Sequence, residues 1–174
     1  MLELTATAAT GPIRTLILAY EGVNLLDISG PLETFEAAEP RRNARERYDT
    51  LIASVSGGQI KTSSSLPIVT RKLADLEHLA IDTVMIGGGS PDGRPAALPE
   101  LVRWIATHAD STRRLCSVCS GAFMLASAGL LDGRRATTHW HWSRLLQQEY
   151  PTILVESNSI FVNDGRIWTS AGVT

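Results

Sequence analysis

Apolar runs rich in β-branched residues alternate along this chain with longer segments in which apolar residues recur every three or four positions. The short runs predict buried strands at residues 13–20, 50–55, 83–86 and 114–118. The helical spacing predicts helices at about residues 31–38, 98–108, 120–128 and 140–149. Strands and helices in this alternation are typical of a mostly parallel sheet covered on both faces, so the pattern predicts an α/β fold.

Two shorter patterns add local structure to this plan. Gly57 and Gly58 precede an alternation rich in Thr and Ser, which predicts a small β excursion rather than a linker. Residues 160–168 place a turn sequence at Asp164 and Gly165 between two strand-like runs, which is a hairpin signal. Because the chain has no internal repeat or low-complexity tract, we expect a flexible tail at residues 1–12 and one domain at residues 13–174.

Composition narrows the range of functions. The chain has 174 residues, with 16 Lys and Arg against 18 Asp and Glu, and its net charge of −2 gives no basic footprint for nucleic acid or an anionic membrane. The apolar stretch at 13–20 is too short to span a membrane, and no secretory signal precedes it. We therefore expect a cytoplasmic protein that does not bind DNA through this chain alone. The basic run at 41–47 is interpreted as a solvated loop.

The sharpest chemical candidate is Cys119, which follows the predicted strand at 114–118 and precedes a predicted helix. A reactive residue on such a strand-to-helix turn forms a nucleophile elbow, which needs small neighbours such as Ser120 and Gly121. The positive end of the helix dipole would also favour the thiolate. The alternative is an inert buried cysteine. Cys116 completes a C-x-x-C pattern, but it falls within the strand and no second pair follows, so neither a redox dithiol nor a zinc site is expected.

Ligands of open α/β sheets bind beyond the carboxyl ends of the strands, and two further segments follow predicted strands. Asp27, or its rival Glu21, could position or protonate a ligand, although capping a helix is the commoner use of such an aspartate. The glycine-rich segment at 87–93 lacks the residues of a Walker loop or a dinucleotide fingerprint. The backbone N–H groups of Gly88 and Gly89 suit an oxyanion or a carboxylate, unless this segment is simply a flexible turn.

His139 is the remaining candidate. It stands just before a predicted helix and could come near Cys119 as an acid/base or ion-pair partner, unless it only caps the helix. His141 follows two residues later, and histidines at this spacing on a helix point apart, so no shared metal is expected.

Four segments together resemble the ThiJ/PfpI superfamily, whose fold is similar to that of class I glutamine amidotransferases. They are the turn at 117–122, the stretch at 128–140, the segment at 27–31 and the terminal segment at 168–174. The resemblance runs from about residue 13 to the end and implies a flavodoxin-like three-layer α/β/α sandwich. Within the superfamily, the chain looks most like the N-terminal domain of AraC-type (GlxA-like) transcriptional regulators, with isonitrile hydratase as the nearest enzyme relative.

The resemblance also implies site residues. Cys119 matches the elbow cysteine of the superfamily, and Ser120 matches the next residue, which lends a backbone N–H to the pocket. Gly88 or Gly89 falls where the oxyanion-binding turn of the family lies. His139 falls in the region where other branches bring a histidine to the thiol.

Asp27 matches the acid that the hydratase branch pairs with its cysteine, and Gly30, in the same motif, is a candidate ligand-binding residue. Glu21 does not clearly occupy the position of the glutamate that the deglycase and peptidase branches use, so the resemblance does not imply those activities.

Two functions follow from the resemblance. The first is a ligand-sensing, homodimerising domain of an AraC-type regulator, with a small-molecule ligand near Cys119 and DNA bound by a helix-turn-helix domain outside this chain. The second is a cysteine-dependent enzyme, such as a hydratase or lyase, with no metal or other cofactor. A dimerising scaffold with a vestigial cysteine is a third. Because family members continue past 169–174 into another helix, we also expect that the domain is truncated here.

Overall fold

The computed structural model of the protein describes residues 12–38 and 47–172. The expected flexible tail, apart from residue 12, and the basic run, apart from Arg47, lie outside the described residues. No helix within the described ranges has the length and apolar character needed to cross a membrane.

The centre of the molecule is an eight-stranded sheet in the order β3-β4-β2-β1-β5-β6-β10-β9. All neighbours from β4 to β10 pair in parallel, whereas β3 and β9 are antiparallel edge strands. The strands are β1 (Ile13–Leu18), β2 (Tyr48–Ser54), β3 (Gly58–Lys61), β4 (Pro67–Lys72), β5 (Thr83–Ile86), β6 (Arg114–Val118), β9 (Phe161–Asp164) and β10 (Ile167–Ser170). A separate two-stranded sheet pairs β7 (Arg135–Ala136) with β8 (Leu154–Val155).

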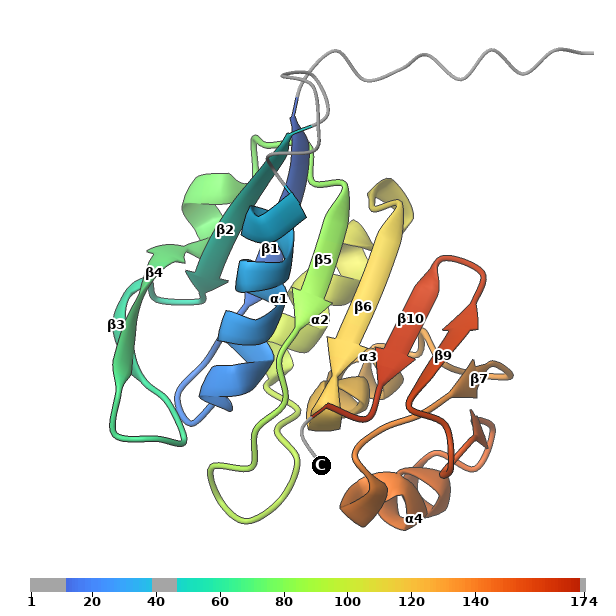
Figure 1. The fold of residues 1–174 in the computed structure, drawn as a ribbon. Coiled ribbons are helices and arrows are strands. Elements are labelled where there is room, and N and C mark those ends of the chain that lie inside the picture. Colours follow the sequence, from blue (N-terminus) through green and yellow to red (C-terminus); the bar gives the residue numbers. More distant parts are fainter. Residues whose placement is uncertain (1–11, 39–46, 173–174) are drawn as a thin grey trace, which may run out of the picture.

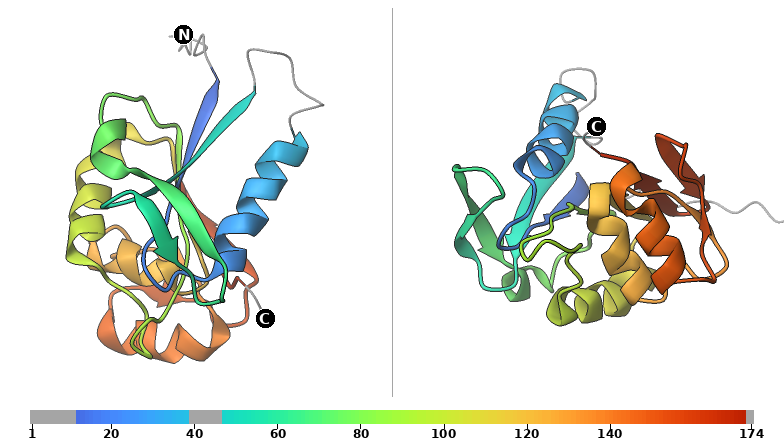
Figure 2. Two further views of the ribbon diagram at one scale, coloured as in Figure 1. Left: turned by 90° about the vertical axis from the view of Figure 1, so that its left-hand side faces the viewer. Right: turned by 90° about the horizontal axis from the view of Figure 1, so that it is seen from below.

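Helices cover both faces of the large sheet. The α-helices are α1 (Leu25–Ala38), α2 (Pro99–His108), α3 (Ala122–Ser127) and α4 (Trp140–Glu149), and short 3₁₀ turns lie at η2 (Leu73–Leu76), η3 (Ala109–Ser111) and η4 (Cys119–Gly121). Helix α1 lies in front of the sheet in Figure 1, with α2 and α3 behind it. Figure 2 shows the three layers from below, with α1 on one side of the sheet and α2, α3 and α4 on the other. The predicted flavodoxin-like α/β/α architecture is confirmed.

Most predicted elements are present. Strands β5 and β6 and helix α4 have the predicted bounds, and the excursion after Gly58 is the β3–β4 hairpin at one edge of the sheet. The hairpin expected at 160–168 is β9–β10 at the opposite edge. The helix expected at 120–128 is shorter, because the 3₁₀ turn η4 takes up residues 119–121 before α3 begins.

The predicted start of the first helix is wrong. We expected Gly30 and Pro31 to open it at residue 31, since proline favours the first helical position. Helix α1 instead begins at Leu25, where the side-chain Oδ1 of Asn24 accepts a hydrogen bond from the N–H of Leu26 at 3.1 Å. Pro31 lies inside the helix and cannot donate to the carbonyl of Asp27. The early start places Asp27 in the first helical turn instead of in a preceding loop.

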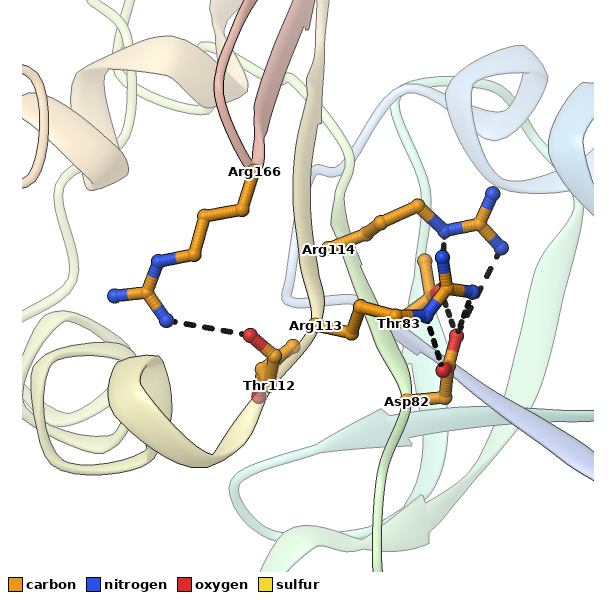
Figure 3. A network of polar contacts seen from close by, with 6 residues as sticks. All are labelled: Asp82, Thr83, Thr112, Arg113, Arg114 and Arg166. Carbon is orange, nitrogen blue, oxygen red and sulfur yellow. Dashed lines mark hydrogen bonds and ion pairs between the residues drawn. The ribbon is translucent and has the colours of Figure 1, made fainter. Parts of the chain in front are cut away.

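An ion network ties together the amino ends of β5 and β6, at the end of the sheet opposite the carboxyl ends of these strands (Figure 3). The Asp82 carboxylate accepts hydrogen bonds from Arg113 at 2.7 and 2.8 Å and from the Thr83 hydroxyl at 2.7 Å. Arg114 lies 3.8 Å from the same carboxylate. Burial acts to raise the pKa of Asp82, but these hydrogen bonds and charges outweigh it and hold the pKa below its usual value.

We predict that Asp82→Asn lowers the free energy of unfolding by about 1 kcal/mol at pH 7. A carboxyl whose pKa is depressed in the folded state stabilises the fold above its unfolded pKa, and this contribution is lost as pH falls through the folded pKa. Urea unfolding should therefore show a constant deficit at neutral pH that shrinks below about pH 4. Asp75→Asn is the control, and a deficit that persists in acid would contradict this account of Asp82.

Candidate functional site

The carboxyl ends of β1, β5 and β6 bring the predicted site residues together. Asp27 lies in the first turn of α1, which follows β1, and its side chain is 2% exposed. Its Oδ2 accepts a hydrogen bond from the backbone N–H of Gly88, which follows β5, at 3.0 Å. Oδ1 is buried and has no partner of good hydrogen-bond geometry. Through Oδ2, Asp27 therefore links the start of α1 to the loop that follows β5.

Cys119 stands at the turn between β6 and α3 with a φ of 57°. Among residues 12–38 and 47–172, it is the only residue other than glycine with a positive φ, a conformation that is strained for an L side chain. Gly121 permits the turn, because a Cβ at this position would lie 2.3 Å from the carbonyl oxygen of Ile86. Gly172 packs against this turn in a similar way. A Cβ added at Gly172 would lie 2.5 Å from the Cβ of Cys119. A positive φ and this close packing are features that a nucleophile elbow requires, while the elbow itself and its nucleophilic reactivity stay predictions.

The buried hydroxyl of Thr138 holds this turn by donating a hydrogen bond to the carbonyl oxygen of Cys119 at 2.7 Å. Thr138→Val is expected to lower the free energy of unfolding by about 1–2 kcal/mol, because it leaves that carbonyl buried without its donor. Thr15→Val is the matched control, since the Thr15 hydroxyl is also buried but has no hydrogen-bond partner. Urea unfolding should show that the control is neutral or stabilised; equal losses in both variants would contradict a specific role for Thr138.

The thiol of Cys119 and the carboxyl of Asp27 form an electrostatic pair. Burial and the neighbouring Asp27 carboxyl together raise the pKa of Cys119 from its ordinary value of 9.0 to about 11, although the N–H and the hydroxyl of Ser120 act in the opposite direction. Burial also raises the pKa of Asp27, although the hydrogen bond from the N–H of Gly88 and the nearby thiol act in the opposite direction. Burial and Asp27 therefore favour the protonated thiol and oppose the thiolate that the helix dipole was expected to favour.

The two glycines expected to bind an oxyanion already use their N–H groups. Gly88 donates to Asp27, and the N–H of Gly89 donates to the hydroxyl of Ser120 at 2.9 Å. That hydroxyl also lies 3.2 Å from the Gly89 carbonyl oxygen. A Cβ on Gly88 would lie 2.6 Å from the backbone nitrogen of Ser120, so the two loops touch directly. An oxyanion could reach these donors only by displacing the side chains of Asp27 and Ser120.

His139 caps α4, as the alternative interpretation held, and it also reaches the site. Its Nδ1 accepts a hydrogen bond from the N–H of His141 at 3.2 Å. A pocket of about 120 Å³ opens beside it, lined by Asn24, Ser63, Gly89, Ser90, Cys119, Ser120, His139 and Trp142. The pocket therefore combines predicted residues with four others, at positions 24, 63, 90 and 142, that the sequence did not mark as individual site residues.

Other candidates lie elsewhere. Gly30 is in the body of α1 and does not line the pocket. Glu21 accepts a hydrogen bond from the N–H of Lys61 and borders a different, larger cavity of about 750 Å³ that does not include Cys119. Cys116 lies in β6 as a free thiol whose pKa burial raises to about 11. Within the described ranges, no group of three or more His, Cys, Asp or Glu side chains could hold a metal ion.

Several known proteins are similar in sequence to this chain over most of its length. A Streptomyces lividans protein, described as an uncharacterized protein in the cpoL 5′ region, is 38% identical over 144 residues, which cover 82% of this chain and 98% of that protein. The HTH-type transcriptional regulator GbdR of Pseudomonas aeruginosa is 34% identical over 158 residues, which cover 88% of this chain but 42% of the regulator. Isonitrile hydratase of Pseudomonas putida is 29% identical over 160 residues, covering 90% of this chain and 64% of the hydratase.

Solved structures share the fold. The crystal structure of an AraC family transcriptional regulator from Pseudomonas putida superposes with a TM-score of 0.79 at 21% identity, covering 92% of this chain and 84% of that chain. The model of the DJ-1/PfpI family matches residues 13–174, which include every residue of the site described above. The chain therefore belongs to the DJ-1/PfpI family.

Proposed function

We propose that this chain is the ligand-binding part of an AraC-type transcriptional regulator, with DNA bound by a helix-turn-helix domain outside the sequence described here. The observation that carries the proposal is the match to GbdR, which spans most of this chain but less than half of that regulator. The net charge of −2 agrees with a division of labour in which another domain contacts DNA. Homodimerisation belongs to the same proposal and is testable by analytical ultracentrifugation.

The pocket beside Cys119 is suited to sensing because its walls come from separate parts of the fold. Asn24 precedes α1, Ser63 follows β3, Ser90 follows β5 and His139 precedes α4. A ligand that contacts these segments stabilises the arrangement in which they are close. Such a ligand shifts a two-state equilibrium only as far as its affinities for the two arrangements differ.

A thermal-shift screen of small metabolites tests the ligand-binding part of the proposal. A ligand at 100 times its Kd stabilises a one-site protein by about 2.7 kcal/mol, which raises the melting temperature measurably. Ser90→Tyr should abolish the shift because its ring fills the small pocket, while Ser157→Tyr at an exposed position outside the pocket should retain it. A shift that survives Ser90→Tyr would place the ligand elsewhere.

The regulator assignment has its own test, which is to sequence the source gene beyond the codon for Thr174. A reading frame that continues into helix-turn-helix patterns supports the regulator. A frame that stops within about one helix removes the DNA-binding half of the proposal and favours an enzyme.

A cysteine-dependent hydratase is the second candidate, favoured by the contact between Cys119 and Asp27 and by the similarity to isonitrile hydratase. In this mechanism the sulfur bonds to the electrophilic carbon of an isonitrile while the thiol proton passes to Asp27 and on to the substrate. Water then adds to that carbon and the thiol is released. Isonitrile hydration should be lost in Cys119→Ala and retained in Cys116→Ala; turnover by Cys119→Ala would exclude the mechanism.

A further inference from the structure

The hydrogen-bond acceptors around the Cys119 pocket are largely occupied by the protein itself. Asn24 Oδ1 accepts from the N–H of Leu26 at the start of α1, and His139 Nδ1 accepts from the N–H of His141 at the start of α4. The hydroxyl of Ser120 is held between the N–H and the carbonyl of Gly89. A ligand that mainly donates hydrogen bonds finds few free acceptors on these side chains.

The donors of the same side chains remain available. The capping hydrogen bond uses Oδ1 of Asn24, so its amide Nδ2 can donate to a ligand. Nδ2 has no hydrogen-bond partner within residues 12–38 and 47–172. An unprotonated Nδ1 in neutral His139 places the ring proton on Nε2. The hydroxyls of Ser63 and Ser90 also line the pocket and can donate. The two capping bonds use the acceptor atoms of Asn24 and His139, so these side chains present mainly hydrogen-bond donors to the pocket.

The charge around the pocket points to an anion. Helices α1 and α4 have 14 and 10 residues, and the caps of both line the pocket, so the positive ends of two helix dipoles meet there. Its lining contains no Lys, Arg, Asp or Glu. Asp27 is not part of the lining, and burial raises its pKa and so weakens its repulsion of an anion.

The volume limits the size of the anion. At roughly 30 Å³ for each water-sized group, a pocket of about 120 Å³ holds about four such groups. We propose that the pocket binds a carboxylate of about this size through the amide nitrogen of Asn24 and Nε2 of His139. This inference rests on the proposed ligand-binding function and specifies the chemical class of the ligand, or of the anchoring part of a longer one.

Three planar probes of equal size separate charge from shape: acetate, acetamide and acetamidinium, each titrated at constant ionic strength with chloride as the background anion. The readout is the shift of the backbone amide signals of Gly89 and Ser120 in a ¹⁵N NMR spectrum. Acetate is expected to shift these signals saturably and at least tenfold more tightly than acetamidinium.

The variants replace donors and keep the helix caps. Asn24→Asp and His139→Asp each retain an oxygen that can accept the capping bond but remove the donor, so each should weaken acetate binding at least tenfold while the melting temperature stays close to that of the unaltered protein. His139→Asn restores an amide donor and should recover part of the affinity. Asn158→Asp makes the same charge change at an exposed position outside the pocket and should leave binding unchanged.

Three results would overturn the proposal: acetamidinium binding at least as tightly as acetate, acetate affinity that is unchanged in Asn24→Asp and His139→Asp, or no saturable acetate binding. If acetamide or acetamidinium shifts Gly89 and Ser120 while acetate does not, the pocket still binds ligands, and only the carboxylate class is wrong. If no probe shifts these signals and the metabolite screen also finds no ligand, the proposed ligand-binding function fails as well.

Discussion

Replacing Gly121 with alanine is expected to lower the free energy of unfolding by about 3 kcal/mol. The added Cβ would lie 2.3 Å from the carbonyl oxygen of Ile86 and 3.1 Å from its carbonyl carbon, and both atoms belong to the backbone at the end of the central strand β5. Neither can swing aside as a flexible side chain would, so the turn that carries Cys119 must move. Urea unfolding measures the loss.

Gly30→Ala is the matched control for this prediction. Like Gly121, Gly30 has a right-handed backbone conformation, and nothing lies within 4 Å of the position that its Cβ would take. This variant therefore adds the same methyl group without a collision and should be neutral or stabilising, because alanine favours a helix more than glycine does. If Gly121→Ala costs no more than Gly30→Ala, the close approach of η4 to β5 does not determine the stability of the turn.

Replacing Asp27 with asparagine is expected to lower the pKa of the Cys119 thiol by about one unit and so raise its thiolate fraction at pH 8 about tenfold. The variant removes a negative charge and keeps an oxygen that can accept from Gly88. Burial is the largest cause of the raised pKa and remains in the variant, so the pKa should fall from about 11 without dropping below its ordinary value of 9.0.

The midpoint of the pH profile of the alkylation rate measures this shift. Cys116→Ala serves as the background, so that Cys119 is the single thiol that reacts. Glu33→Gln provides the control, because it neutralises an exposed carboxylate on the same helix. An unchanged midpoint in Asp27→Asn would mean that burial alone sets the pKa of Cys119.

The raised pKa of Cys119 bears on both proposed functions. A protonated thiol beside a carboxyl is a poor target for oxidation or alkylation at neutral pH, because the thiolate is the reactive form. In a hydratase, the substrate would have to meet the thiol and Asp27 together so that the proton moves as the sulfur attacks. In a sensor, the protonated thiol adds no negative charge that would repel a bound carboxylate.

The sequence by itself determined the fold class, the positions of most strands and helices, and the tight strand-to-helix turn at Cys119. Periodicity carries this information because burial on a sheet or helix face repeats with the backbone, and the small residues around Cys119 reflect clearance that any tight strand-to-helix turn needs. The association of Asp27 with Cys119 came from the family resemblance, and in the structure Asp27 lies close enough to Cys119 to raise the pKa of its thiol.

Only the tertiary structure decided where α1 begins, which donors are free and how the thiol is charged. Pro31 looked like a helix start because local preference places proline there, but the cap by Asn24 moved the start to Leu25. Gly88 and Gly89 looked like free donors because a sequence does not show which side chains arrive from 31 or 61 residues away. The pKa of Cys119 depends on burial and on Asp27, both of which arise when distant segments pack together, so no local pattern could have given it.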